Sequence, residues 1–188
     1  SMTSVDKQIQ LSSVQSVGFT PPVRLSNSRF VVATDRAQQT LKVFDSINES
    51  WTDIFDYSDC IDLDMEHHFD AVDYHTLSYD NMNNIYYIYT GAYLLEIDMN
   101  KQEKNMALYQ SSFGDAGLYP VSVFVNGKLH VIGGYDSNCH IIFDPETKLW
   151  TKAYEFSEFE GISSAALIHI KSKDCLLYTS DAADDVLC

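Results

Sequence analysis

Short runs rich in valine, isoleucine, leucine and tyrosine alternate with polar turns along most of the chain. The clearest runs are RFVVATD (29–35), NIYYIYTG (84–91) and KLHVIGGY (128–135). Each run is shorter than a typical globular helix and is dominated by β-branched and aromatic residues, which favour strands. Two further strand candidates, HTLSYD (75–80) and VSVFVNGK (121–128), precede the second and third runs. The pattern predicts an all-β chain.

Tight turns join these candidates into hairpins. Asn126-Gly127 lies between two apolar alternations, and DNMNN (80–84) separates another pair. Asn-Gly is a strong hairpin signal because both residues accept positive φ. Consecutive strands are therefore expected to pair antiparallel.

The chain also repeats itself. VFDSINESWTDI (43–54) and IFDPETKLWTKA (142–153) both place Phe before Asp, then Trp and Thr at the same later positions. A weaker copy, LLEIDMNKQEKNMAL (94–108), keeps the Asp but has no Trp. Asp45, Asp98 and Asp144 recur at intervals of about 50 residues, and each period holds a four-stranded antiparallel meander. Meanders repeated at this length stack radially as the blades of a β-propeller.

We assign the chain to a propeller fragment of about three and a half blades. Residues 1–23 form an N-terminal extension or part of a preceding blade, 24–57 blade 1, 58–73 an acidic inter-blade loop, 74–112 blade 2, 118–157 blade 3, and 162–174 the start of blade 4.

The best repeat resembles the kelch family, whose motif is an apolar strand ending in a glycine pair, then a spaced aromatic and a later Trp. Gly133, Gly134, Phe143 and Trp150 match this motif. The first repeat keeps Phe44 and Trp51 but has Ala33-Thr34 in place of the glycines, and the second keeps only Gly91. The Gly-His and Trp-Asp signatures of the competing WD-repeat propeller are absent.

The resemblance implies structural roles for these residues. The glycines would let the backbone turn and approach its neighbours closely, and the aromatic residues would pack between adjacent blades. The run Tyr86-Tyr87-Ile88-Tyr89 is expected to send some side chains to the core and others to the surface.

The end of the chain departs from the repeat. CLLYTSDAAD (175–184) resembles one reading frame of a widely used transposon-derived sequencing adapter. We therefore expect 175–188 to be a non-native tail, the alternative being a genuine polar C-terminus. Since propellers close with four to eight blades, the remaining blades are expected from a missing part of the chain.

Composition limits the kinds of partner and the cellular location to be expected. The formal charge of −15 disfavours nucleic acid, which needs clustered Lys and Arg, and is compatible with a protein partner that has a basic surface. The alternative is that the acidity only keeps the protein in solution. Cys60, Cys139, Cys175 and Cys188 lie far apart and are expected to be reduced thiols. No signal peptide or membrane span is recognisable, so a cytoplasmic location without membrane contact is expected.

One acidic segment raises the question of a metal. Kelch-type specifier proteins of plants bind ferrous iron through E-x-x-x-D-x-x-x-H, and Glu66 and Asp70 match its first spacing. Tyr74 takes the third position, and His75 comes one residue late, which in a strand reverses its face. We therefore expect neither cofactor nor catalysis. A metal-dependent kelch enzyme or specifier protein using Glu66, Asp70 and His75 stays the alternative.

The resemblance points to a protein-interaction scaffold or substrate receptor, because family members serve as ubiquitin-ligase receptors and as cytoskeletal or signalling scaffolds. Their partner contacts often come from the loop after the glycine pair and from the loop linking blades. In this chain those positions are Arg36, Gln38, Tyr135, Asp136 and Asn138 for the first loop, and Glu66 and His67 for the second. A carbohydrate-binding propeller is a weaker alternative.

Overall fold

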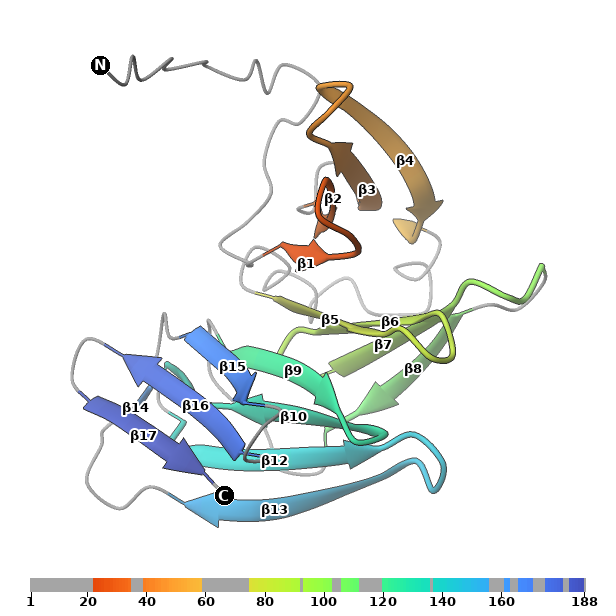
Figure 1. Cartoon of the computed structure of the whole chain (residues 1–188). Coiled ribbons are helices and arrows are strands. Elements are labelled where there is room, and N and C mark those ends of the chain that lie inside the picture. Colours follow the sequence, from red (N-terminus) through yellow and green to blue (C-terminus); the bar gives the residue numbers. More distant parts are fainter. Residues whose placement is uncertain are drawn as a thin grey trace, which may run out of the picture.

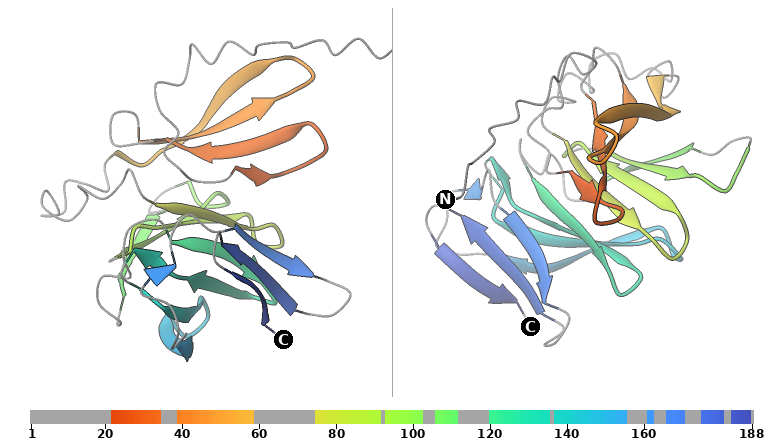
Figure 2. Two further views of the ribbon diagram at one scale, coloured as in Figure 1. Left: turned by 90° about the vertical axis from the view of Figure 1, so that its left-hand side faces the viewer. Right: turned by 45° about the horizontal axis from the view of Figure 1, so that its top comes forward.

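The computed structural model consists of small antiparallel sheets arranged around a common axis (Figures 1 and 2). It describes residues 22–34, 39–58, 75–91, 93–102, 106–111, 120–135, 137–155, 161–162, 166–170, 175–180 and 183–187. Three of the sheets have four strands each. The prediction of an all-β propeller fragment is confirmed.

Each blade is a meander of consecutive strands. Blade 1 contains β1 (Val23–Arg24), β2 (Arg29–Ala33), β3 (Thr40–Asp45) and β4 (Ser50–Asp56). Blade 2 contains β5 (Thr76–Asp80), β6 (Ile85–Tyr89), β7 (Tyr93–Asp98) and β8 (Met106–Gln110). Blade 3 contains β9 (Val121–Val125), β10 (Lys128–Ile132), β12 (Cys139–Asp144) and β13 (Leu149–Glu155).

The last sheet, blade 4, has three strands: β15 (Ala166–Ile170), β16 (Cys175–Ser180) and β17 (Ala183–Leu187). A separate ribbon pairs β11 (Gly134–Tyr135) with β14 (Gly161–Ile162). The first strands of neighbouring blades, β1, β5, β9 and β15, lie side by side at the axis (Figure 1).

The segment attributed to an adapter lies in blade 4. The chain continues after residue 174 as β16, which pairs with β15, and then as β17. Its first residues, CLLY, are apolar and compatible with a strand. The non-native origin of 175–188 stays a prediction.

The two best sequence repeats have the same pairing register. Phe44 lies opposite Trp51 across β3 and β4, as Phe143 lies opposite Trp150 across β12 and β13. In both hairpins the pairing register also shifts near the start of the first strand, β3 or β12. Corresponding residues of blades 1 and 3 can therefore be compared directly.

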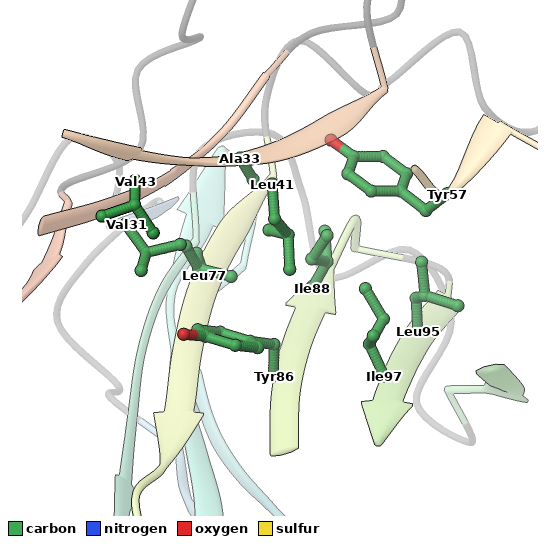
Figure 3. Close-up of a cluster of buried hydrophobic side chains, with 10 residues drawn as sticks. All are labelled: Val31, Ala33, Leu41, Val43, Tyr57, Leu77, Tyr86, Ile88, Leu95 and Ile97. Atoms are coloured by element: carbon green, nitrogen blue, oxygen red, sulfur yellow. The ribbon is translucent and has the colours of Figure 1, made fainter. Parts of the chain in front are cut away.

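Blades 1 and 2 share one hydrophobic core, drawn in Figure 3. Its buried side chains come from both sheets: Val31, Ala33, Leu41, Val43, Tyr57, Leu77, Tyr86, Ile88, Leu95 and Ile97. Tyr57 closes the end of this core, and its hydroxyl donates a hydrogen bond to the carbonyl of Thr34 at 2.5 Å. Burial of these apolar side chains stabilises the contact between the two blades.

A second core joins blades 2 and 3. Its buried side chains are Tyr87, Tyr89, Leu94, Leu129, Val131, Ile141 and Phe143. Phe143 also contacts Trp150 and Tyr109, with ring centroids 5.0 and 5.2 Å away. Phe143 and Trp150 therefore pack against the preceding blade, as the resemblance implies.

The expectation for the tyrosine run is wrong. Tyr86 and Ile88 face blade 1, while Tyr87 and Tyr89 face blade 3, and none of the four is more than 3% exposed. Side chains do alternate along β6, but a blade covers each face of the sheet. This run therefore contributes no side chain to the protein surface.

One ion pair crosses the second interface. Glu96 on β7 is 8% exposed, and both of its carboxylate oxygens accept hydrogen bonds from Lys148 Nζ, at 3.2 and 2.9 Å. Burial opposes the charge on Lys148, but the hydrogen bonds and charges of Glu96 and Tyr109 together outweigh it and leave the pKa of Lys148 raised. Lys148 lies in the last turn of blade 3, so the pair holds that turn against blade 2.

Truncating Phe143 to alanine should weaken the interface between blades 2 and 3 and so lower the free energy of unfolding. Phe143 is fully buried, and comparable Phe→Ala changes lower the free energy of unfolding by about 3–5 kcal/mol. Phe44→Ala is the matched control, because Phe44 has the same place in blade 1 but is only half-buried. Chemical denaturation of both variants checks this, and equal losses would contradict the inter-blade role of Phe143.

Candidate functional site

The chain reversals of the blades lie at two opposite ends. Because strands alternate in direction, the turns after the first and third strands lie at one end, which we call the turn face. Its described residues in blades 1 to 3 are 25–28, 46–49, 81–84, 99–102, 126–127 and 145–148. The strand ends that lead into the loops after the second strands and into the links between blades lie at the opposite end, the loop face.

Aspartates fix the geometry of the turn face. In four turns the side chain of the last strand residue accepts a backbone N–H from two residues ahead, at 2.9–3.0 Å: Ile47 to Asp45, Met82 to Asp80, Asn100 to Asp98 and Glu146 to Asp144. Such Asx contacts mimic a backbone turn. The repeated Asp read from the sequence is therefore the residue that closes each outer hairpin.

Hydrogen bonds favour the ionised form of Asp45 and Asp144. Backbone hydrogen bonds from Asn48 and Ile47 hold the pKa of Asp45 below its ordinary value. The backbone N–H of Glu146 has the same effect on the pKa of Asp144. Asp144 also forms an ion pair with Lys128, whose Nζ lies 3.2 Å away and which follows the other turn of blade 3.

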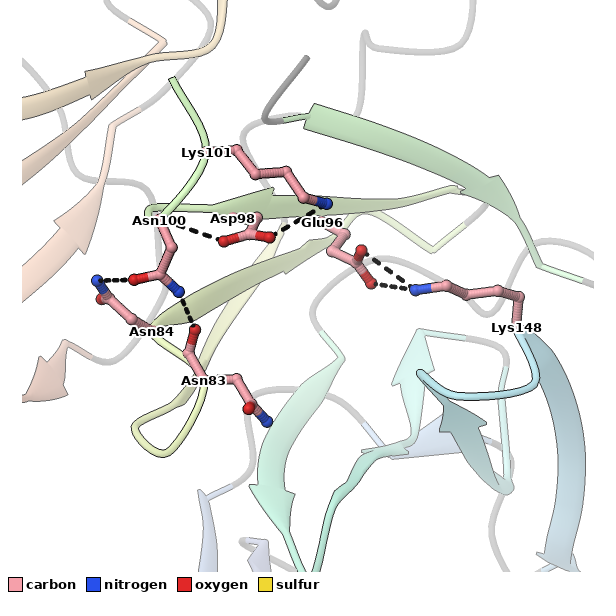
Figure 4. A network of polar contacts seen from close by, with 7 residues as sticks. All are labelled: Asn83, Asn84, Glu96, Asp98, Asn100, Lys101 and Lys148. Atoms are coloured by element: carbon pink, nitrogen blue, oxygen red, sulfur yellow. Dashed lines mark hydrogen bonds and ion pairs between the residues drawn. The ribbon is translucent and has the colours of Figure 1, made fainter. Parts of the chain in front are cut away.

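The two turns of blade 2 are joined by asparagines (Figure 4). The Nδ2 of Asn100 donates to the carbonyl of Asn83 at 2.6 Å, and Nδ2 of Asn84 donates to Oδ1 of Asn100 at 3.4 Å. Both turns therefore hold their positions relative to each other. The turn face is rigid enough to present side chains in a defined arrangement.

Large apolar side chains project from this rigid face. Ile47 is 77% exposed, Met82 86% and Leu149 65%. Ile47 and Met82 take the same place, two residues after the turn Asp, while Leu149 directly follows the last turn of blade 3. Single exposed apolar residues are common, but here three blades each present one at the same end.

Sequence reasoning missed these residues, although a signal was present. Both D-S-I (45–47) and D-N-M (80–82) place an apolar residue inside a polar turn. Ile47 and Met82 each bind, through the backbone N–H, the Asp side chain two residues earlier, and their own side chains are exposed. The repeat alignment could therefore have indicated them.

Most residues predicted for partner binding lie outside the described residues: Arg36, Gln38, Glu66, His67 and Asp136. The two described ones, Tyr135 and Asn138, lie on the loop face. Tyr135 belongs to β11, where its backbone pairs with Gly161, so this loop is tethered to the connection toward blade 4. Asn138 is half-buried, and its Oδ1 lies 3.6 Å from the thiol of Cys139.

The glycines follow the ends of β6 and β10, as the resemblance implies, and Gly134 also begins β11. Gly133 and Gly134 have φ of 69° and 124°, and Gly91 has φ of 96°. Residues other than glycine rarely adopt positive φ. Gly133 also donates its N–H to the carbonyl of Cys139 at 3.0 Å, which closes the loop between β10 and β12.

The structure describes only one of the three predicted metal ligands. Glu66 and Asp70 fall outside the described residues, and His75 is buried just before β5. Among the residues that are described, no three His, Cys, Asp or Glu side chains come together as a metal site would need.

Two histidines meet inside blade 3. Nδ1 of His130 lies 3.0 Å from Nε2 of His140, and His140 is 6% exposed. The shared register makes them counterparts of Val31 and Leu41, which belong to the core of blades 1 and 2. They therefore lie on the face of blade 3 that points away from blade 2. Burial, with a smaller contribution from the charge of His130, lowers the pKa of His140 to about 4.

Comparison with known proteins supports the fold alone. No protein-family profile matches the chain, and no curated protein sequence matches it either. Among solved structures it is similar to PorZ, an essential surface component of the type-IX secretion system of Porphyromonas gingivalis, with 18% identity and a TM-score of 0.60. It is also similar to YjhT, with 13% identity and a TM-score of 0.55, and to a protein of unknown function from Bacteroides thetaiotaomicron, with 8% and 0.56.

These alignments cover nearly all of this chain but only part of the others. They include 92%, 92% and 91% of the chain, and 25% of PorZ, 65% of YjhT and 40% of the Bacteroides protein. The chain thus spans a portion of each of these structures.

No helix in the described part has the length and apolar character needed to cross a membrane.

Replacing the histidine pair by its blade 1 counterparts should remove a pH dependence of stability. A histidine has a pKa of about 6.5 when unfolded, and His140 has one of about 4 when folded. Its contribution is therefore complete above about pH 6.5 and is lost as pH falls toward 4, by up to about 3 kcal/mol. The free energy of unfolding should fall over this range in the wild type and much less in His130→Val/His140→Leu.

Urea unfolding at pH 7.5 and 5 measures this difference. Both pH values lie above the ordinary pKa of carboxyl groups, so the comparison reports mainly on histidine. Equal losses in the two proteins would show that the buried pair does not govern the acid sensitivity.

Proposed function

We propose that this chain is a non-catalytic protein-interaction module, a kelch-type propeller fragment that binds a protein partner through its turn face. The supporting observation is that Ile47, Met82 and Leu149 extend from hydrogen-bonded turns of three blades with most of their surface in water. Leaving such side chains exposed gives no folding benefit, whereas burying each one in a complex would contribute about 1.5–3 kcal/mol.

The surrounding charges favour a basic partner. Glu146 is the blade 3 counterpart of Ile47 and Met82, and it is exposed on its turn. Glu49, in the outer turn of blade 1, is exposed as well. Acidic groups around apolar anchors attract a partner with lysine or arginine near its own apolar contacts. We place this interaction in the cytoplasm, as the sequence suggests.

The loop face is the competing location within the same proposal. The resemblance to kelch proteins favours it, whereas the exposed apolar residues favour the turn face. The tether between β11 and β14 also restricts part of the loop that the resemblance selects. Variants on the two faces separate these possibilities.

Removing the three apolar anchors should abolish partner binding without unfolding the chain. In Ile47→Asp/Met82→Asp/Leu149→Asp, each change is expected to weaken the complex by about tenfold or more. Wild type, this variant and the loop-face variant Asn138→Asp are used as matched baits, and quantitative mass spectrometry compares the proteins they retain. Circular dichroism checks that all three are folded.

The expected result is a set of proteins retained by the wild type and by Asn138→Asp but lost by the triple variant. Binding that survives the triple variant but is lost in Asn138→Asp would move the interaction to the loop face. Binding unaffected by either variant would contradict the proposal for the turn face.

Reversing one charge should test the expected basic partner. Glu146→Lys keeps the turn, because Asp144 binds the backbone N–H at this position and not the side chain. Association with a basic partner should slow and become less dependent on salt. Biolayer interferometry at two ionic strengths measures the rate, and Lys101→Glu, on an exposed turn residue of blade 2, is the control with the opposite charge change. Faster association of Glu146→Lys would indicate an acidic partner.

A further inference from the structure

A hollow of about 220 Å³ lies at the axis, against the first strands of blades 1 to 3. Its wall is formed by Pro22 and Val23, by residues 76–79 of β5 and by residues 121–124 of β9. Consecutive residues of each strand take part, although their side chains point to alternating faces. The strands therefore border the hollow with their backbone edges.

These edges have hydrogen-bonding groups available. Among the described strands, β5 pairs with β6 alone, and β9 pairs with β10 alone. The edge of each strand that points to the axis therefore carries N–H and C=O groups without a strand partner. Such groups require water or a polar ligand.

Three hydroxyls lie beside this polar surface. Ser122 Oγ lies 2.9 Å from Thr76 Oγ1 and 2.6 Å from Ser78 Oγ. Thr76 and Ser78 are only 2% and 3% exposed, whereas Ser122 is half-buried. Each hydroxyl has one donor and two acceptor positions, so Ser122 is the member of the cluster that can still bond to a ligand.

The lining contains no charged side chain, although the whole chain has a formal charge of −15. Its one titratable group is the phenol of Tyr79, which donates to Oδ1 of Asn84 at 3.0 Å. Burial raises the pKa of Tyr79 and keeps it neutral. An ionic ligand would lose hydration in the hollow without gaining an opposite charge.

Two aromatic rings complete the wall, and other rings hold both in place. Tyr79 stacks on Tyr86 at a centroid distance of 4.4 Å, and Phe124 stacks on Tyr87 at 5.3 Å. Their positions are thus set before any ligand enters, which lowers the entropy lost on binding. Aromatic surface beside hydroxyl and amide groups suits a ligand with apolar C–H faces and polar edges.

Size limits the ligand to one ring. A cavity of about 150 Å³ holds benzene, so 220 Å³ accommodates a six-membered ring with small substituents. We infer that the axial hollow binds one ring of a neutral saccharide, with Ser122 and the inner edges of β5 and β9 as its hydrogen-bonding partners. This inference is independent of the turn face and of the proposed protein interaction.

Saturation-transfer NMR with D-glucose, D-galactose and N-acetyl-D-glucosamine tests the inference on the whole chain. At least one neutral sugar should receive saturation from the protein, and D-glucuronate, which has a similar ring with a carboxylate, should not. Ser122→Ala removes the hydroxyl that joins the other two and should weaken binding by about 2- to 10-fold. Val23→Trp leaves the cluster intact but fills the hollow, and it should abolish binding even if Ser122→Ala affects folding.

Thr40→Val is the matched control. It removes a similar contact between hydroxyls, Thr34 Oγ1 to Thr40 Oγ1 at 3.1 Å, away from the hollow, and binding should persist. Absence of any signal from the neutral sugars would overturn the inference. So would equal signals from D-glucuronate, or binding that survives Val23→Trp.

Discussion

Each central sheet of this protein needs a neighbour on both of its faces, and most other features depend on that constraint. Blade 2 shows it most clearly, because Tyr86 and Ile88 are buried against blade 1 while Tyr87 and Tyr89 are buried against blade 3. A small four-stranded sheet cannot cover these surfaces alone. Stability is therefore shared between blades, and a charge is accommodated at an interface when it is paired, as Glu96 is with Lys148.

The same constraint determines where recognition can occur. With both faces of a central sheet occupied, the surfaces that this sheet leaves for binding are its turns, its loops, its outer strand and its edge at the axis. The aspartate contacts fix the backbone of the turns from which Ile47 and Met82 project. At the axis, the inner strands lack further strand partners, and this gives the hollow its polar character.

Sequence periodicity predicted the strands and the repeat because both arise from local patterns. Asn126-Gly127 marked a hairpin and the recurrent Asp marked the outer turns, and both signals act within a few residues. Burial of the whole tyrosine run was not predictable in this way, since it depends on a blade at each face. The His130–His140 contact joins separate strands at diagonal positions, and the hollow needs three blades at once. The predicted Glu66 and His67 lie outside the described residues.

The turn aspartates have a further consequence for how such a surface can change. Their side chains bind the backbone two residues ahead, so the side chain at that position is not needed to close the turn. Three of the turns carry Ile47, Met82 and Glu146 there, which differ in size, polarity and charge. In the fourth turn, Asn100 also joins the two turns of blade 2. Folding and specificity are thus decoupled at the first three positions. A propeller built on this turn can acquire a new partner through single substitutions while its blades stay as they are.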